Sequence, residues 1–254
     1  MMSDYVLVAI AGLLAGGVNA VAGGGTLISF PALLAVGVPA VAANITSSVG
    51  LVSGYLGSAV GYRRELSDQR ERMRSLAFVS ILGGVVGAVV LLVTPENSFR
   101  VIVPYLVVVA CLLLAGQPRL ARWVAGRSSG GSHGGSGVTP LVQAGVFIAA
   151  VYGSYFGAGL GVLLLGVLGI LVSDSLQRLN GLKSMLSFIV NLVGVLIFVV
   201  SGQVLWTFAG LLLVSSYVGG VLGARVARML SPVVLRYSIV TLGLAVAVVL
   251  IITG

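Results

Sequence analysis

Apolar residues dominate this chain in long stretches separated by short polar segments. About 20 consecutive apolar residues are enough to cross a bilayer as a helix, and we find about eight stretches near or above that length. The pattern therefore predicts an all-α membrane protein. The expected hydrophobic segments are residues 5–36, 40–62, 73–93, 98–116, 140–172, 175–200, 204–226 and 232–253.

The first and fifth segments are too long to cross once as straight helices. Each has about 32 residues, which would extend about 48 Å against a hydrocarbon core of about 30 Å. Each also has a glycine cluster in its middle, at residues 23–25 and 157–161, and glycine favours a helix break. Each segment is therefore either one tilted, kinked helix or two half-helices that turn at the glycines.

The polar and glycine positions repeat at one fixed offset of 136 residues. Asn44 corresponds to Asn180, and most of the glycines pair at the same offset without a gap. The repeat indicates a tandem duplication, and duplicated halves of membrane transporters commonly enclose a central site. We expect a first membrane repeat at residues 1–125, a Gly/Ser-rich flexible linker at 126–138 and a second membrane repeat at 139–254.

The composition indicates which partners the chain is expected to have. The chain is 58% hydrophobic and only 8% charged, whereas a soluble domain is about 25% charged. A net charge of +8 could suit a nucleic acid, but the arginines flank membrane segments, so we expect the lipid bilayer and no nucleic acid. The one cysteine, Cys111, allows no intrachain disulfide or multi-cysteine metal site. The only histidine, His133, lies in the linker, where we expect no metal or catalytic role.

The basic residues help to choose the topology. If all eight segments cross once, Lys and Arg divide 8 against 6 between the two sides. If the first and fifth segments enter and return, 13 fall on one side and only Arg100 on the other. Because basic residues concentrate in the cytoplasm, the second arrangement is preferred. Three net crossings per half make the repeats inverted, with a cytoplasmic linker and both termini external.

Polar residues inside the apolar segments are the candidate site. Polar groups are costly in hydrocarbon and usually face a cavity or one another, and half-helix N-termini can bind anions. Lys183 adds a positive charge, whereas its counterpart at the 136 offset is Ser47. The expected substrate-binding residues are Asn19, Gly23, Gly24, Gly25, Thr26, Asn44, Thr46, Ser47, Ser48, Tyr155, Gly159, Gly161, Asn180, Lys183, Ser184 and Asn191.

Some of these polar residues could instead have a purely structural role. Asn44 and Asn180 could instead hydrogen-bond between helices, and Lys183 could extend to the membrane interface. A further group of glycines has the spacing that allows close helix packing, which we prefer for these positions. They are Gly83, Gly84, Gly87, Gly219, Gly220 and Gly223.

Several runs resemble the sulfite exporter TauE/SafE family, also called the four-segment sulfite uptake family. These runs are residues 17–34, 43–50, 178–184 and 202–206, and the resemblance covers nearly the whole chain except the linker. The resemblance implies a multi-pass transporter of the bacterial inner membrane that exports sulfite or organosulfonates such as sulfoacetate.

The sequence leaves two alternative transport functions open and argues against an enzyme. A passive anion channel, or a transporter of another small organic anion, would use the same features. An enzyme is not expected, because no histidine lies in a membrane segment to act as a base. No ATP-binding loop motif is present, so we expect a secondary transporter without a cofactor or metal. The sequence leaves homo-oligomerisation open.

Overall fold

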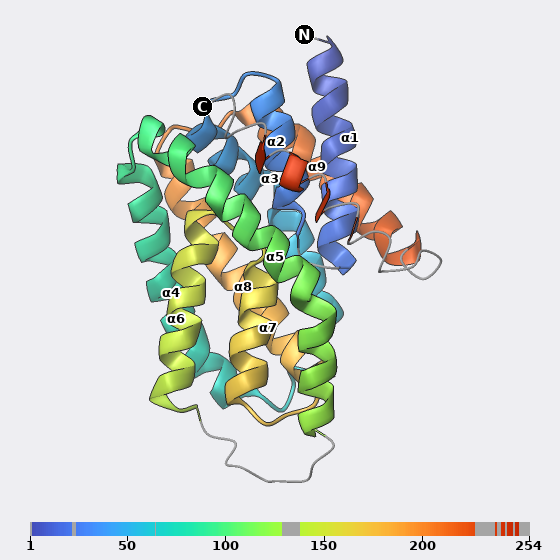
Figure 1. Cartoon of the computed structure of the whole chain (residues 1–254), viewed down its shortest axis with the longest axis vertical. Helices are drawn as coiled ribbons and strands as arrows, with labels where there is room; N and C mark the ends of the chain where they lie inside the picture. The colour runs from blue at the N-terminus through green and yellow to red at the C-terminus, as the bar shows by residue number, and fades with distance from the viewer. Residues whose placement is uncertain are drawn as a thin grey trace.

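The structure is a computed structural model that describes residues 2–21, 24–63, 65–128 and 138–226, with short stretches between 237 and 248. Within this part the chain is helical and contains no strand, which confirms the expected all-α class (Figure 1). The helices are α1 (Met2–Val21), α2 (Thr26–Ala35), α3 (Ala40–Gly61), α4 (Arg70–Val93), α5 (Glu96–Ser128), α6 (Pro140–Tyr155), α7 (Leu160–Leu171), α8 (Leu176–Val200) and α9 (Trp206–Val226).

Four of the described helices contain stretches long and apolar enough to cross a membrane. The stretches are Met2–Asn19, Arg70–Val93, Glu96–Leu120 and Leu176–Val200. Large apolar side chains also point outward, and Phe78 and Leu112 are 64% and 65% exposed. An apolar outer surface of this kind is costly in water and suits a bilayer.

Two of the apolar segments consist of two helices each. In the first, α1 ends at Val21 and α2 begins at Thr26. In the other, α6 ends at Tyr155 and α7 begins at Leu160, and the turn contains Gly157 and Gly159 with φ angles of 81° and 80°. Side chains rarely allow this left-handed backbone, so glycine is required at both points. In Figure 1, α1 and α2 occupy the upper part of the molecule, and α6 and α7 occupy the lower part.

Helices α3 and α8 pack against each other and connect the rest of the bundle. Helix α9 packs on α1 and α3, while α4 packs on α6 and α8. The α4–α6 contact is close because a Cβ on Gly87 would lie only 2.2 Å from the carbonyl oxygen of Val151. A Cβ on Gly219 of α9 would lie 1.9 Å from the carbonyl oxygen of Leu13 on α1. The close-packing explanation is confirmed for these two glycines.

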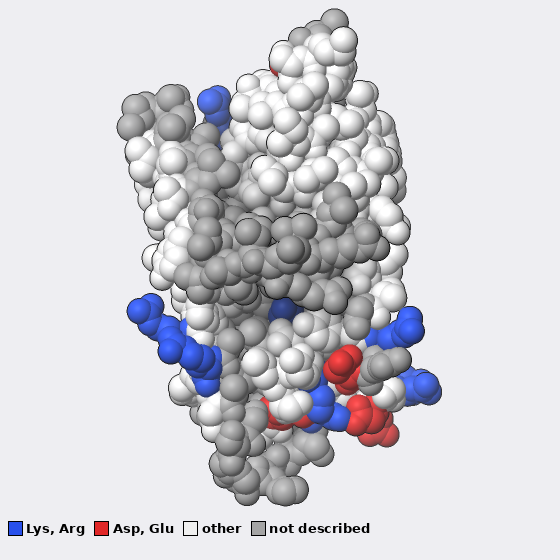
Figure 2. All heavy atoms as spheres, turned by 90° about the vertical axis from the view of Figure 1, so that its right-hand side faces the viewer, with Lys and Arg blue, Asp and Glu red and all other residues white. Residues whose placement is uncertain are grey.

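The lower end of the molecule in Figure 1 is the basic end. It contains the α3–α4 loop (62–69), the end of α5, the start of α6 and the α7–α8 loop (172–175). Figure 2 shows that the Lys and Arg side chains on the face drawn lie mainly at this end. Two helices that start here have side-chain caps: Thr139 accepts from Val142 N, and Ser175 accepts from Arg178 N.

Helices α4 and α5 extend beyond the apolar segments expected from the sequence. Helix α5 continues to Ser128, three residues into the expected linker, because residues 117–128 are rich in helix-favouring Ala, Leu and Arg. Helix α4 begins at Arg70 rather than at 73, and Glu71 in its first turn complements the helix dipole. Gly23, His133 and most of the eighth apolar segment lie outside the described residues.

Candidate functional site

Asn44 links α3 to the broken α6–α7 segment. Its side chain is fully buried, and its amide nitrogen donates to the carbonyl oxygen of Tyr155 at 2.8 Å. That carbonyl lies at the C-terminus of α6, where helix carbonyls lack helical partners. The bond fixes the orientation of the amide and leaves Asn44 Oδ1 buried without a partner. Asn44 therefore stabilises the break and also presents an unused acceptor.

The two helix breaks meet near Thr26. Thr26 is the first residue of α2, and its hydroxyl lies 3.7 Å from where a Cβ on Gly157 would be. The Tyr55 side chain of α3 is buried and lies near Thr26. The start of α2 and the turn before α7 therefore lie side by side, with hydroxyl groups between them.

Lys183 brings a positive charge toward the start of α7. Its Cδ and Cε atoms lie 3.8 Å from where a Cβ on Gly161 would be. The side chain is half-buried, and no acidic residue in the described part of the chain forms an ion pair with it. Gly159, which precedes α7, provides no side-chain cap for the helix. The aliphatic part of the Lys183 side chain therefore lies against the first turn of α7, and an ammonium group and a helix N-terminus each favour an anion.

Three of the candidate hydroxyls have partners within the protein. Ser47 lies 2.6 Å from the hydroxyl of Ser29, which joins α3 to α2. Thr46 accepts from the backbone N–H of Leu205, just before α9. Ser48 donates to the carbonyl of Asn44 one turn earlier. These contacts give each hydroxyl a structural role in the helix packing.

The second half does not repeat the Asn44 contact. Asn180 donates to the carbonyl of Leu176 in its own helix at 3.0 Å. Asn19 and Asn191 are buried, and each has an Oδ1 atom without a partner in the described structure. Ser184 is also buried, 2% exposed. Asn44 therefore joins two helices, whereas Asn180 makes a hydrogen bond within its own helix.

The glycines at the first break pack closely. A Cβ on Gly25 would lie 2.6 Å from the carbonyl oxygen of Ala15, so α2 begins directly against α1. Gly24 lies against Leu114 of α5, with 3.4 Å between that side chain and a Cβ built on the glycine. Both glycines allow close approach and offer no side-chain ligand.

Sequence reasoning did not assign Tyr55 or Gly157 to the site. Gly157 was part of the expected glycine cluster, but its contact with Thr26 depends on how two distant segments pack. Tyr55 lies 29 residues after Thr26 in the chain and on a different helix. The sequence alone does not show that the two side chains come together. The available signal was a further polar side chain in the segment that already contains Asn44, Thr46, Ser47 and Ser48.

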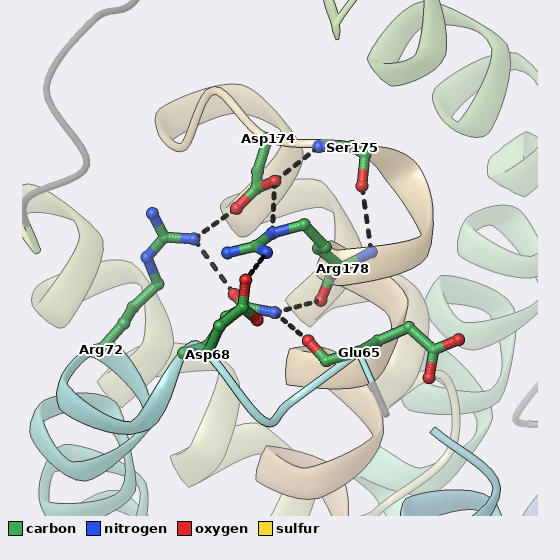
Figure 3. Close-up of polar contacts among 7 residues, drawn as sticks. Glu65, Asp68, Arg72, Asp174, Ser175 and Arg178 are labelled. Atoms are coloured by element: carbon green, nitrogen blue, oxygen red, sulfur yellow. Dashed lines mark hydrogen bonds and ion pairs between the residues drawn. The ribbon is translucent and has the colours of Figure 1, made fainter. Parts of the chain in front are cut away.

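A second polar cluster connects the two halves of the chain at the basic end. Arg72 binds Asp174 at 2.7 Å, and Arg178 binds Asp174 through Nε at 2.8 Å and also Asp68 (Figure 3). Gln69 donates to the carbonyl oxygens of Glu65 and Arg178. The α3–α4 loop is thereby tied to the start of α8. We call Asp68, Gln69, Arg72, Asp174 and Arg178 the ion-pair cluster.

The two aspartates of the ion-pair cluster are held ionised. Burial raises the pKa of Asp174, but hydrogen bonds from Arg72, from the Ser175 N–H and from Arg178 outweigh it, and the net shift is downward. The hydrogen bond from Arg178 also lowers the pKa of the exposed Asp68. Because these pKa values lie below 3.8, the cluster keeps its charges at neutral pH and loses them only as the pH falls below that value.

No group of three or more metal-ligating side chains occurs among the described residues.

The comparisons with known proteins agree with this picture of a membrane protein. The family model for sulfite exporter TauE/SafE matches residues 8–250. The chain belongs to the TauE/SafE family.

Curated relatives carry the same general description. A probable membrane transporter protein ORF9 of Sinorhizobium is 24% identical over 94% of this chain and 89% of its own. A probable membrane transporter protein of Haemophilus influenzae is 25% identical over 90% and 87%. The probable membrane transporter protein YfcA of Escherichia coli is 26% identical over 84% and 77%. No solved structure matches. This TauE/SafE protein is a multi-pass membrane transporter.

The unequal roles of Asn44 and Asn180 lead to a stability prediction. Asn44→Leu should lower the free energy of unfolding by about 1–3 kcal/mol, because the part-buried Tyr155 carbonyl loses its donor. Asn180→Leu should cost less, because Leu176 lies in the same helix and keeps a backbone partner. Thermal unfolding of the two purified variants in detergent measures the difference. Equal losses would show that Asn44 has no special role at the α6 terminus.

Proposed function

We propose that this TauE/SafE transporter is a secondary transporter that exports small sulfur-containing anions, sulfite or organosulfonates such as sulfoacetate, by alternating access. The observation that carries the proposal is the position of Lys183 beside the start of α7, without an acidic partner among the described residues. An unpaired charge inside a membrane protein is costly unless a ligand or water compensates it. A small anion provides that compensation.

The proposed site lies where the two helix breaks meet. Thr26, Tyr55 and the Gly157 turn form one side, and Lys183 lies over Gly161 on the other. Asn44 Oδ1 can accept a hydrogen bond, so a protonated oxyanion or a ligand water can be accommodated as well. The substrate class comes from the family description, which names sulfite, and the residues add the preference for a small anion.

The proposed architecture is a pair of inverted repeats, residues 1–125 and 139–254. At the 136-residue offset α1 corresponds to α6, α4 to α9 and α3 to α8. The α1–α9 contact then has the α6–α4 contact as its counterpart, and α3–α9 has α8–α4. The gathering of basic side chains at one end supports a cytoplasmic position for that end. Both termini are then external, in the inner membrane of a bacterium.

The topology has a direct test. A reporter that is active only in the cytoplasm should be active when inserted at residue 130 and inactive when fused after Gly254. Both fusions are made in the same full-length chain, and expression is normalised by immunoblot. A periplasmic result at residue 130 would reject the inverted arrangement, because the linker would then lie on the external side.

The Lys183 proposal predicts a selective loss of anion binding. Lys183→Gln should weaken sulfite binding about 10- to 100-fold, since a hydrogen bond to a charged group contributes about 1.5–3 kcal/mol. Lys183→Arg should keep most of the affinity. Binding is measured by calorimetry with purified protein, with sulfate, thiosulfate, taurine and sulfoacetate tested alongside.

Arg100→Gln is the control, since Arg100 lies in α5 and is not part of the proposed site. Unchanged sulfite affinity in Lys183→Gln would remove Lys183 from the site. Uptake into liposomes separates a carrier from a passive channel: saturable flux with counterflow supports the carrier, and conductive flux without saturation contradicts it.

The ion-pair cluster supports an alternating-access mechanism. It joins the α3–α4 loop of the first half to Asp174 and Arg178 of the second half across the basic end. Arg72 and Asp174 are 10% and 13% exposed, so this pair is better shielded than an ordinary surface pair. In the proposal the cluster closes the cytoplasmic end, and opening that end separates its partners.

A charge exchange tests this closure. Arg72→Asp and Asp174→Arg should each reduce transport several-fold, because each places like charges together and shifts the population toward an open basic end. The double variant should recover much of the rate. A second measurement uses Arg72→Cys with Asp174→Cys in a Cys111→Ala background, where a short bifunctional thiol reagent should stop transport. Arg122→Asp is the control for charge alone. Full transport by the cross-linked protein would contradict the gate.

A further inference from the structure

An apolar groove opens near the basic end between α3, α4 and α8, outside the proposed transport site. Its volume is about 260 Å³. The side chains that line it come from both halves of the chain. They include Leu56, Val60, Arg63, Arg70, Met185 and Phe188.

The apolar wall of the groove faces outward. Leu56 and Val60 lie four residues apart on α3 and are 47% and 51% exposed. Met185 and Phe188 lie three residues apart on α8 and form the opposing wall. Exposed apolar side chains on a membrane helix are solvated by lipid chains. The groove can therefore hold part of an acyl chain.

Two arginines lie at the rim of the groove. Arg63 follows the end of α3, and Arg70 is the first residue of α4. Both are exposed, and no ion pair of either one occurs in the part of the chain that the structure describes. Arg72, two residues after Arg70 in α4, belongs instead to the ion-pair cluster. The rim thus has two positive charges that the described acidic residues do not neutralise.

We propose that this groove is a binding site for an anionic phospholipid, with the phosphate at Arg63 and Arg70 and part of one acyl chain against Leu56, Val60 and Phe188. A free anion would use the arginines but gain nothing from the apolar wall. A zwitterionic lipid would use the wall but gain less from the two charges. The combination of the two surfaces at one end of a membrane protein favours a lipid with a negative headgroup.

The size and position of the groove agree with this occupant. Cavities that enclose a whole drug-sized ligand measure about 300–1,000 Å³, so a groove of 260 Å³ holds a segment of a chain while the rest lies along the helices. The equivalents of Arg63 and Arg70 at the 136 offset are Val199 and Trp206. The corresponding positions in the second half therefore have no basic rim, and the site is expected only at the basic end.

The test compares lipid binding by the full-length protein and its variants in detergent. Phosphatidylglycerol should remain bound to the wild type in native mass spectrometry and raise its unfolding temperature more than phosphatidylcholine does. Arg63→Gln with Arg70→Gln should weaken phosphatidylglycerol binding about 30-fold, the loss expected for two basic residues near an anionic headgroup. Val60→Trp, which fills the groove and keeps both arginines, should also weaken it.

The matched control removes two other exposed arginines from the same end of the molecule. Arg119→Gln with Arg122→Gln lowers the net charge equally but leaves the groove intact. An equal loss of phosphatidylglycerol in this control would reduce the effect to general charge and overturn the proposal. Equal protection by inorganic phosphate or by sulfite would also overturn it, because the rim would then select a free anion without using the apolar wall.

Discussion

The structure depends on how it satisfies broken backbone inside an apolar protein. Where a helix stops at membrane depth, its terminal N–H and C=O groups have no water to bind, and each unsatisfied group costs several kcal/mol. The chain ends one helix at Val21 and another at Tyr155, and the nearby Thr26 and Phe156 are buried in the bundle. At the second, Asn44 binds the Tyr155 carbonyl and the Tyr152 hydroxyl binds the Ala158 carbonyl at 2.8 Å. These bonds make the break stable, and they also bring polar atoms to the interior.

The charged residues of the ion-pair cluster neutralise one another, whereas Lys183 has no acidic partner among the described residues. At the basic end, Asp68 and Asp174 neutralise Arg72 and Arg178 through short contacts that join distant segments. Near the start of α7, Lys183 has no such acidic partner among the described residues. In the proposed function the neutralised cluster closes the cytoplasmic end and does not attract small anions. An unneutralised ammonium group remains available to a ligand, which is why the proposed function places the substrate there.

The sequence predicted the helical class and membrane character well, because both depend on local hydrophobic patterns that cannot be hidden in 254 residues. It predicted the helix boundaries less well. Helix α5 extends beyond its apolar part, since Ala, Leu and Arg favour helix even where the chain leaves the membrane. Periodicity describes which face of a helix is apolar, and it gives no information about a polar extension of this kind.

The contacts of the candidate site were harder to predict, because they join residues that are distant in the chain. Asn44 and Tyr155 are 111 residues apart, and Arg72 and Asp174 are 102 apart. Composition places each residue near a helix end or inside an apolar stretch, but the partner is decided by how helices pack. The ion pairs of Arg72 and Arg178 with Asp174 were therefore not predicted. Thr46 was expected in the site, and the structure pairs it with Leu205.

The ion-pair cluster also bears on the energies of the conformations available to a doubled chain. Two identical inverted halves would have two closed forms of equal energy, one for each side of the membrane. Asp68, Arg72, Asp174 and Arg178 correspond at the 136 offset to Val204, Phe208, Val38 and Ala42, which cannot form ion pairs at the opposite end. In the proposed inverted-repeat transporter the cluster would therefore make the two closed forms unequal in energy, and the form closed at the basic end would be the preferred resting conformation.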